Sequence, residues 1–435
     1  MKALIFPCLM GLLTASAMGA DWPQWRGPYF NGSSDEKAIP ATWSKTENVA
    51  WSAELPGPAA STPVVSGDTV FVSSSDLVAQ GLMAMAFERK TGKVLWKHAV
   101  AEGTHRDEKS NFASPSPATD GKRVVFFYGN GDLVAFDFKG NKLWSRNIQK
   151  DFGEFAFQWT FSSSPLLYDG KLFLQVLQRD VPANGRGKKD GPNESYLLAM
   201  DPATGKTLWR VLRPSDALVE SREAFSTPVP FVQGGRKELL ITGGDCVSGH
   251  DPESGKELWR WGTWNPGKIG HWRLVPSPVA GEGIVLACAP KGSPVYAVKA
   301  GGNGFLDDTH IAWKSAERGV VSSDVPTPAF YGGDFIFLSD VRKTISRIEP
   351  KSGKVKWSLE LPGRAKFEAS PTVVDGKAFL MNFAGEVAVV EVDKGELLRV
   401  IAMGEERDDT TRSAVVVSHG QLFIRTNNRL YCVGR

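Results

Sequence analysis

Residues 198–209 read Leu-Ala-Met-Asp-Pro-Ala-Thr-Gly-Lys-Thr-Leu-Trp, and residues 251–259 repeat the same order of residue types as Asp-Pro-Glu-Ser-Gly-Lys-Glu-Leu-Trp. In both stretches a glycine turn follows an acidic residue, and a tryptophan stands four positions after the glycine. Short apolar runs on either side of such a turn are typical of a β-hairpin, because glycine readily adopts the positive φ that the turn needs. The recurrence of the stretch indicates a repeat protein.

The same ending recurs along the whole chain. Its tryptophans are Trp51, Trp96, Trp144, Trp209, Trp259, Trp313 and Trp357. We expect each of them to wedge between neighbouring repeats as a large apolar side chain, next to small residues such as Ala135 or Ala199. One repeat departs from the pattern, because Asp307-Asp308-Thr309 precedes Trp313 without the glycine.

Each repeat also has a recognisable start, a Ser/Thr-Pro dipeptide followed by apolar runs. The prolines are Pro63, Pro115, Pro165, Pro228, Pro278, Pro328 and Pro371, and Ala414 takes the proline position of an eighth copy. Each unit reads as four short strands with no helical periodicity, and four strands in about 40 to 50 residues is the length of a propeller blade. The sequence therefore predicts an all-β fold, an eight-bladed β-propeller of four-stranded blades.

The order of the strands predicts how the ring closes. The first tryptophan strand, residues 48–55, precedes the first Ser/Thr-Pro start, and the last unit runs out after three strands. We expect the N-terminal strand to complete the last blade, which leaves no open sheet edge. Residues 21–435 then form one propeller domain, in which residues 21–56 are a leader and the closing strand.

The net charge and the N-terminal residues indicate the class of protein and the cellular compartment in which it acts. The formal net charge of +3 is too small to indicate a nucleic-acid-binding protein. Residues 1–20 combine Lys2, an apolar run and small residues near Ala17 and Gly19, which is typical of a signal peptide. We expect a periplasmic or secreted protein with no transmembrane segment after signal cleavage, acting as a monomer.

Motifs for catalysis or metal binding are absent from the sequence. The cysteines after residue 20 are Cys246, Cys288 and Cys432, which form no CxxC pair. The sequence leaves open whether all three are buried free thiols or Cys246 and Cys288 form a disulfide. The six histidines form no HExxH motif. We therefore expect no catalytic residue and no metal site.

The quoted repeats resemble pyrroloquinoline-quinone-type β-propeller repeats. The resemblance extends to the leader, Asp21-Trp22-Pro23-Gln24-Trp25-Arg26-Gly27-Pro28, and covers residues 21–435. It implies one of two functions. One is a scaffold without a cofactor, as in the propeller subunit of the outer-membrane β-barrel assembly machinery. The other is a quinoprotein dehydrogenase, which would use pyrroloquinoline quinone (PQQ) with calcium. No residue matches the calcium site of those enzymes, so the resemblance assigns no catalytic residue here.

The linkers before the Ser/Thr-Pro starts supply the candidate site. In a propeller they ring the mouth of the central channel, where we expect a protein, small-molecule or carbohydrate ligand to bind. The candidate residues are His105, Arg106, Asp107, Trp159, Arg222, Glu223, His271, Trp272, Arg273, Arg318, Asp324, Lys366, Glu368 and Arg412. A Gly- and charge-rich insert, residues 179–195, is either a solvated loop or a partner-binding loop.

Trp159 and Trp272 stand at equivalent positions, each six residues before a repeat's proline. Either both indoles line one pocket at the channel mouth, or both pack down on neighbouring blades. Together these features favour an exported, non-enzymatic binding or scaffold propeller of the bacterial cell envelope. The alternative is a divergent PQQ-dependent oxidoreductase.

Overall fold

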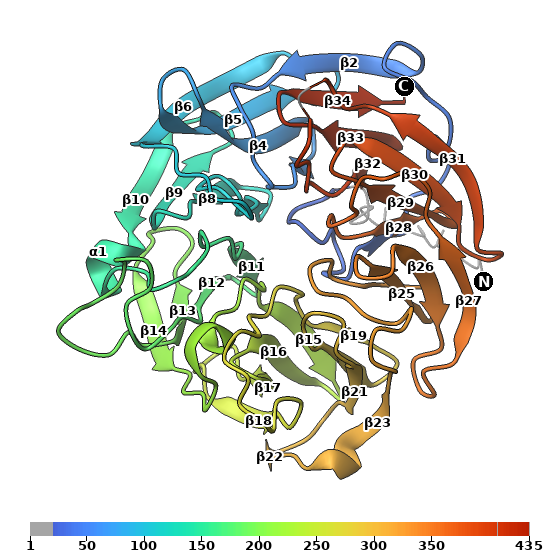
Figure 1. Ribbon diagram of the computed structural model, residues 1–435. Coiled ribbons are helices and arrows are strands. Elements are labelled where there is room, and N and C mark those ends of the chain that lie inside the picture. The colour runs from blue at the N-terminus through green and yellow to red at the C-terminus, as the bar shows by residue number, and fades with distance from the viewer. Residues whose placement is uncertain (1–20, 407, 435) are drawn as a thin grey trace, which may run out of the picture.

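The computed structural model describes residues 21–406 and 408–434, and the expected signal peptide lies outside these residues. The described residues form eight sheets arranged as a ring around a central axis (Figure 1). Short strands explain this architecture: they are two to nine residues long, and most of the hairpin turns between them contain a glycine with positive φ. The predicted eight-bladed β-propeller is confirmed.

The strands of each blade follow one another from the axis outward. Blades one to four contain β3 (Val64–Ser66), β4 (Thr69–Asp76), β5 (Gly81–Glu88) and β6 (Val94–Glu102); β7 (Ala118–Thr119), β8 (Arg123–Phe127), β9 (Asp132–Asp137) and β10 (Lys142–Asn147); β11 (Leu166–Tyr168), β12 (Lys171–Val176), β13 (Tyr196–Met200) and β14 (Thr207–Leu212); β15 (Val229–Gln233), β16 (Arg236–Gly243), β17 (Cys246–His250) and β18 (Glu257–Trp261). Blades five to seven contain β19 (Val279–Gly281), β20 (Ile284–Cys288), β21 (Val295–Lys299) and β23 (Ile311–Lys314); β24 (Ala329–Tyr331), β25 (Asp334–Ser339), β26 (Thr344–Ile348) and β27 (Val355–Glu360); β28 (Thr372–Val374), β29 (Lys377–Met381), β30 (Glu386–Glu391) and β31 (Glu396–Ala402).

Blade eight closes the ring with both ends of the described chain. It contains β32 (Val416–Ser418), β33 (Gln421–Arg425) and β34 (Arg429–Val433), and its outer strand is β2 (Val49–Glu54). β2 runs antiparallel to β34, with Val49 opposite Val433 and Trp51 opposite Cys432. The predicted closure is therefore confirmed, and β2 covers the edge that β34 would otherwise expose.

Three short helices and two extra strands complete the described structure. The helices are α1 (Ile148–Phe152) and the 3₁₀ turns Val219–Arg222 and Asp308–His310. The extra strands lie parallel to the edges of two blades: β1 (Ser33–Ser34) beside β28, and β22 (Gly304–Phe305) beside β18.

The repeated tryptophans link each blade to the next. Six of the seven lie against the turn glycine of the following blade, where a Cβ atom would fall 2.5–2.8 Å from the indole: Trp51 on Gly92, Trp96 on Gly140, Trp144 on Gly205, Trp209 on Gly255, Trp313 on Gly353 and Trp357 on Gly395. A backbone carbonyl oxygen of the same turn often accepts the indole N–H; for example, Trp144 Nε1 donates to Pro202 O at 2.9 Å. The turn therefore requires glycine for two reasons: the positive φ of the backbone, and the indole of the preceding blade, which leaves no room for a Cβ atom.

Trp259 departs from this pattern, because the following turn has no glycine. Its Nε1 donates instead to Glu238 Oε2 within the same blade, at 2.6 Å. In place of the missing turn, the chain forms a 3₁₀ turn that begins after Asp307, whose side chain accepts the N–H of Thr309. Extra strand β22 lies beside Trp259.

The structure corrects the repeat register at two starts. β7 begins at Ala118, so Pro117 and not Pro115 precedes the innermost strand of blade two. The error arose because Ser114-Pro115-Ser116-Pro117 contains the dipeptide twice. β32 begins at Val416, so Ala414 stands in the Ser/Thr position of blade eight, one residue earlier than the proline position assigned to it.

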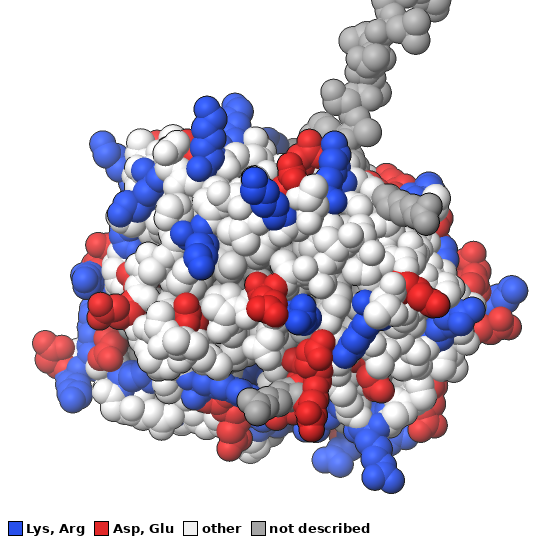
Figure 2. Space-filling view, turned by 90° about the horizontal axis from the view of Figure 1, so that it is seen from above, with Lys and Arg blue, Asp and Glu red and all other residues white. Residues whose placement is uncertain are grey.

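The surface carries both signs of charge. Figure 2 shows basic and acidic side chains intermingled on the side of the ring that faces the viewer, in keeping with the small net charge. Among the described residues, no helix is long and apolar enough to span a bilayer. The three cysteines in this part of the chain are free and buried, so Cys246 and Cys288 are not joined.

Candidate functional site

A ring of side-chain hydroxyl groups surrounds the axis, just before the innermost strands. The backbone N–H of the Ser/Thr in one blade donates to the hydroxyl of the Ser/Thr in the next, over 2.8–3.2 Å. The seven bonds begin at the N–H of Ala414, pass in turn through Thr62, Ser116, Ser164, Thr227, Ser277 and Thr327, and end at the hydroxyl of Ser370, which only accepts. All eight residues are 2–8 % exposed. Proline follows seven of these eight residues directly and lacks an N–H, so the residue before the proline is the one that can donate.

The ring of hydroxyls has one gap. Ser370 would donate to blade eight, but Ala414 occupies that position and has no hydroxyl group. Among the described residues the seven remaining bonds therefore run in one direction around the axis and stop between blades seven and eight.

An axial pocket of about 160 Å³ opens beside this ring of hydroxyls. All eight ring residues line it. Its other walls include two indoles, a phenyl ring and four charged side chains: Trp25, Lys109, Trp159, Phe225, Arg273, Glu368 and Arg412. A concave site with aromatic walls and a few polar groups is suited to binding a ligand.

The leader contributes Trp25 to this pocket. The leader is fixed at two places around the ring. Trp22 forms a β-bridge with Val65 in blade one. Arg26 donates to Pro328 O (2.8 Å) and Pro371 O (3.0 Å), which precede the inner strands of blades six and seven. In Figure 1 the blue leader passes close to the centre of the ring. Burial lowers the pKa of Arg26 to about 9, so this cation is held by carbonyl dipoles rather than by water.

Four of the predicted site residues meet at the axial pocket: Trp159, Arg273, Glu368 and Arg412. Arg412 Nε lies 2.9 Å from Glu368 Oε2. Arg273 makes a two-pronged contact with Asp324, a further predicted residue, at 3.2 and 3.3 Å. Because both arginines are paired with carboxylates, these side chains form a fixed wall rather than free charges.

Other predicted residues lie apart from the axial pocket. Trp272 is half-buried against the apolar cluster that contains Trp261 and Trp264, so the two equivalent tryptophans differ: Trp159 lines the pocket and Trp272 packs on a blade. His271, Arg318 and Lys366 are exposed. His105 lines a neighbouring pocket, together with Asp107 and Phe112 of the same linker. Arg106 contacts Thr410 Oγ1 at 3.2 Å, and Arg222 pairs with Asp180 at 3.5 Å.

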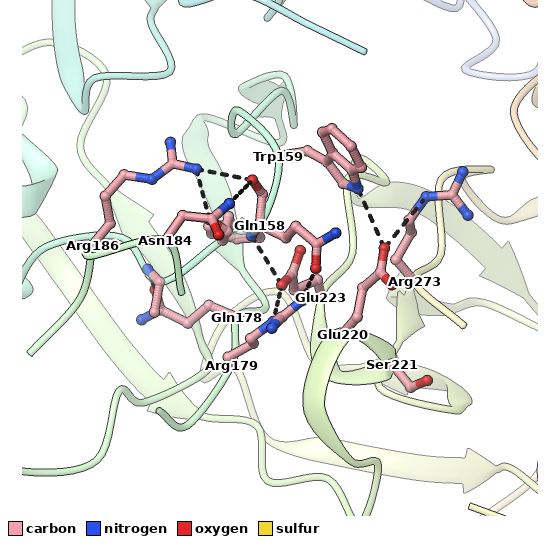
Figure 3. Close-up of polar contacts among 12 residues, drawn as sticks. Gln158, Trp159, Gln178, Arg179, Asn184, Arg186, Glu220, Ser221, Glu223 and Arg273 are labelled. Atoms are coloured by element: carbon pink, nitrogen blue, oxygen red, sulfur yellow. Dashed lines mark hydrogen bonds and ion pairs between the residues drawn. The ribbon is translucent and has the colours of Figure 1, made fainter. Parts of the chain in front are cut away.

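A network of polar contacts holds Trp159 and the neighbouring Gln158 in place (Figure 3). Trp159 Nε1 donates to Glu220 Oε1 at 3.3 Å. Glu223 is fully buried, accepts the N–H of Gln158 at 3.0 Å and pairs with Arg179. Burial raises the pKa of Glu223 to about 7, although Arg179 acts in the opposite direction.

Asp107 fixes the linker before blade two. It accepts hydrogen bonds from Thr160 N (2.6 Å) and Thr160 Oγ1 (2.7 Å), and from the N–H groups of Lys109 and Ser110. Burial acts to raise the pKa of Asp107, but these hydrogen bonds outweigh it and hold the pKa below its usual value. Asp107 therefore positions the pocket wall through Thr160.

Sequence reasoning missed the ring of hydroxyls, Lys109 and Trp25. The hydroxyls belong to the Ser/Thr of seven repeat starts, but a residue type that recurs beside proline does not by itself reveal a hydrogen bond between blades. Trp25 could have been found from its place beside Arg26 in the leader only if the leader's path across the ring were known.

The family resemblance implies PQQ with calcium, and the side chains of the axial pocket bear on whether that pair could bind there. Within the described residues, no three His, Cys, Asp or Glu side chains gather where they could hold a metal ion. The nearby carboxylates Glu368 and Asp324 are both bonded to arginine, so they are not a free set of oxygen ligands for calcium. These residues do not fit a quinone held beside calcium.

Comparison with known proteins gives one family and two kinds of relative. The family model described as outer membrane protein assembly factor BamB matches residues 33–180 and 193–435. The polyvinylalcohol dehydrogenase of Sphingopyxis sp. (strain 113P3) is 29 % identical over 196 residues, which are 43 % of this chain and 28 % of the relative. The match thus spans less than a third of that relative's length.

Two solved structures show the same fold at low identity. BamB from Moraxella catarrhalis has a TM-score of 0.56 and 14 % identity, covering 89 % of this chain and 97 % of that one. Quinohemoprotein alcohol dehydrogenase from Comamonas testosteroni has a TM-score of 0.62 and 14 % identity, covering 96 % and 82 %. At this identity the likeness concerns the fold alone.

Proposed function

We propose that the chain, which belongs to the family described as outer membrane protein assembly factor BamB, is a non-enzymatic binding or scaffold propeller of the bacterial cell envelope. Its binding site would be the linker face around the axial pocket. The observation that carries this proposal is the pairing of Arg273 with Asp324 and of Arg412 with Glu368, which gives the pocket a rigid recognition wall. A preformed wall favours binding because little side-chain freedom is lost when a ligand arrives.

Lys109 is the side chain best placed to contact a partner. It is exposed, lines the axial pocket, and its Nζ lies 5.7 Å from the centre of the Trp159 ring. No ion pair of Lys109 occurs among the described residues, so its charge is available to a ligand. Reversing this charge changes the mouth of the pocket without removing a partner from a buried ion pair.

The test is affinity capture from envelope extract with residues 21–435 as bait. The bait is compared with Lys109→Glu and with the matched charge reversal Lys122→Glu, an exposed lysine in the turn between β7 and β8. We expect the captured partner to be retained by Lys122→Glu and lost with Lys109→Glu. Identical capture by all three baits would contradict binding at this mouth.

The second candidate function is a divergent PQQ-dependent oxidoreductase, favoured by the partial match to polyvinylalcohol dehydrogenase. The axial pocket itself counts against this candidate, because Glu368 and Asp324 are bonded to arginines and are not free to hold calcium. The test is addition of PQQ and calcium to the purified protein, followed by visible spectroscopy and dye reduction with polyvinyl alcohol. A bound-quinone spectrum with dye reduction would replace the scaffold proposal, and a featureless spectrum would count against the enzyme.

A further inference from the structure

A second pocket lies beside the axial one and shares a wall with it. Its volume is about 340 Å³, and Trp159 lines both pockets. The lining residues are His105, Asp107, Phe112, Gln158, Trp159, Asn184 and Arg186. This side pocket lies off the axis, between the linkers before blades two and three and the insert of blade three.

The insert is folded onto this pocket. Asn184 and Gly185 both have positive φ, 49° and 78°, and Ala183 bridges to Arg186, which together make a tight hairpin turn. Asn184 Nδ2 donates to Gln158 O at 3.0 Å, and Arg186 Nη2 donates to Phe157 O and Gln158 O at 2.8 and 3.0 Å (Figure 3). The segment that the sequence marks as a loop is thus one wall of the side pocket.

One charged side chain in the lining of the side pocket, that of Arg186, forms no ion pair in the described part of the chain. Arg186 is half-buried and bonds only to carbonyl oxygens, and no carboxylate partner for it occurs among the described residues. The neighbouring arginines Arg179 and Arg222, in contrast, pair with Glu223 and Asp180. The one carboxylate in the lining, that of Asp107, is already occupied by hydrogen bonds. A guanidinium with free N–H groups at a pocket wall is suited to a carboxylate.

The remaining groups fit a sugar. Trp159 and Phe112 supply aromatic surfaces, and His105 packs against Phe112 with ring centres 5.3 Å apart. Within the described residues, Nε2 of Gln158 and Oδ1 of Asn184 have no hydrogen-bond partner. Aromatic faces pack against the C–H face of a sugar ring, whereas free amide groups exchange hydrogen bonds with its hydroxyls.

We propose that the side pocket binds an acidic saccharide, with the uronate carboxylate on Arg186 and a sugar ring against Trp159. This inference deepens the proposed function, since it rests on a binding role for the propeller and names a ligand class for a site next to the axial pocket.

The test is calorimetric titration of residues 21–435 with four probes. Trigalacturonate and trimannuronate carry the acidic sugar, maltotriose is the neutral sugar, and a tri-glutamate peptide carries carboxylates without a sugar ring. We expect binding of at least one uronate trimer in the micromolar to millimolar range, and at least tenfold weaker binding of maltotriose and of the peptide. Equal binding of maltotriose or of the peptide would overturn the ligand class, and no binding of either uronate trimer would overturn the site.

Variants then locate the site. Arg186→Gln should weaken the uronate trimer about tenfold or more, as expected for loss of a charged hydrogen bond. Lys189→Gln removes the same charge from an exposed position in the insert outside the pocket lining and should change affinity less than twofold. Unchanged affinity in Arg186→Gln would refute the proposal.

A second variant covers the case in which Arg186→Gln disturbs the insert. Gln158→Glu keeps the side-chain oxygen that accepts from Arg179 but adds a negative charge to the side pocket, so it should also abolish uronate binding. Retained uronate binding by Gln158→Glu would overturn the proposal. Lys109→Glu serves for the axial pocket: loss of partner capture with intact uronate binding would separate the two sites.

Discussion

Removing one hydroxyl from the axial ring should destabilise the propeller far more than removing a neighbouring hydroxyl outside it. Ser277 is 4 % exposed, and its Oγ accepts the N–H of Thr227 at 2.8 Å. In Ser277→Ala that N–H loses its partner inside the ring. Ser162 lines the same pocket, but no hydrogen bond of its side chain occurs among the described residues, so Ser162→Ala is the matched control.

The expected magnitude follows from the unpaired donor. A buried N–H left without an acceptor costs about 1–3 kcal/mol, whereas a change away from such features stays within about 0.5 kcal/mol. Ala414→Ser is the reverse change. It offers a hydroxyl to the N–H of Ser370 at the gap, and one added hydrogen bond is worth about 0.5–1.5 kcal/mol.

The assay is thermal and urea unfolding of residues 21–435 for the wild type and the three variants. In a chain of this length 1 kcal/mol shifts Tm by only about 1 °C, so the urea midpoint is the more sensitive readout. We expect Ser277→Ala to unfold at lower urea, Ala414→Ser at higher urea, and Ser162→Ala at the wild-type midpoint. Equal midpoints for Ser277→Ala and Ser162→Ala would refute the role of the ring.

Three further changes test closure, blade packing and burial of charge. Deleting residues 21–56 removes β2 and should expose the edge of β34, giving oligomers in size-exclusion chromatography and a lower Tm; a monomer as heat-stable as residues 21–435 would contradict the closure. Gly205→Ala places a Cβ 2.6 Å from the Trp144 ring at a φ of +70° and should cost about 1–3 kcal/mol, and an unchanged urea midpoint would rule this out. Burial raises the pKa of Glu223 from 4.5 to about 7, so the folded state binds more protons than the unfolded state and stability falls as pH rises through this range. Glu223→Gln should therefore gain up to about 3 kcal/mol on the wild type between pH 5 and 8, and a stability difference that does not vary with pH would argue against it.

The fold could be predicted from the sequence because its signals are local and repeated. The glycine turn, the tryptophan four residues later and the alternating short strands lie within each repeat, and the early position of Trp51 gave the closure. The register failed at Pro115 and Ala414, where the dipeptide is doubled or degenerate. At these two starts the register follows only from the residue at which the inner strand begins, Ala118 or Val416.

The site could be predicted only in part because convergence depends on the exact path of each linker. Trp159 and Trp272 occupy equivalent sequence positions, yet one lines the axial pocket and the other packs on an apolar cluster. The following residues explain the difference: Thr160 is held by Asp107, whereas Arg273 turns to Asp324. Such contacts join distant segments, so no periodicity in the sequence reports them.

The pairing of β2 with β34 has a consequence for how the molecule forms. Its two strands are separated by 384 positions, from Val49 to Val433, whereas strands within the other blades are joined by far shorter connections, even where blade three carries its insert. Contacts between distant positions form slowly, because a long loop must close before they provide any stabilisation. Individual blades can fold early, but until β34 exists the molecule is an open arc with an unpaired strand at one end. The time spent as this arc, rather than the folding of any one blade, should set the rate of maturation and the risk of aggregation.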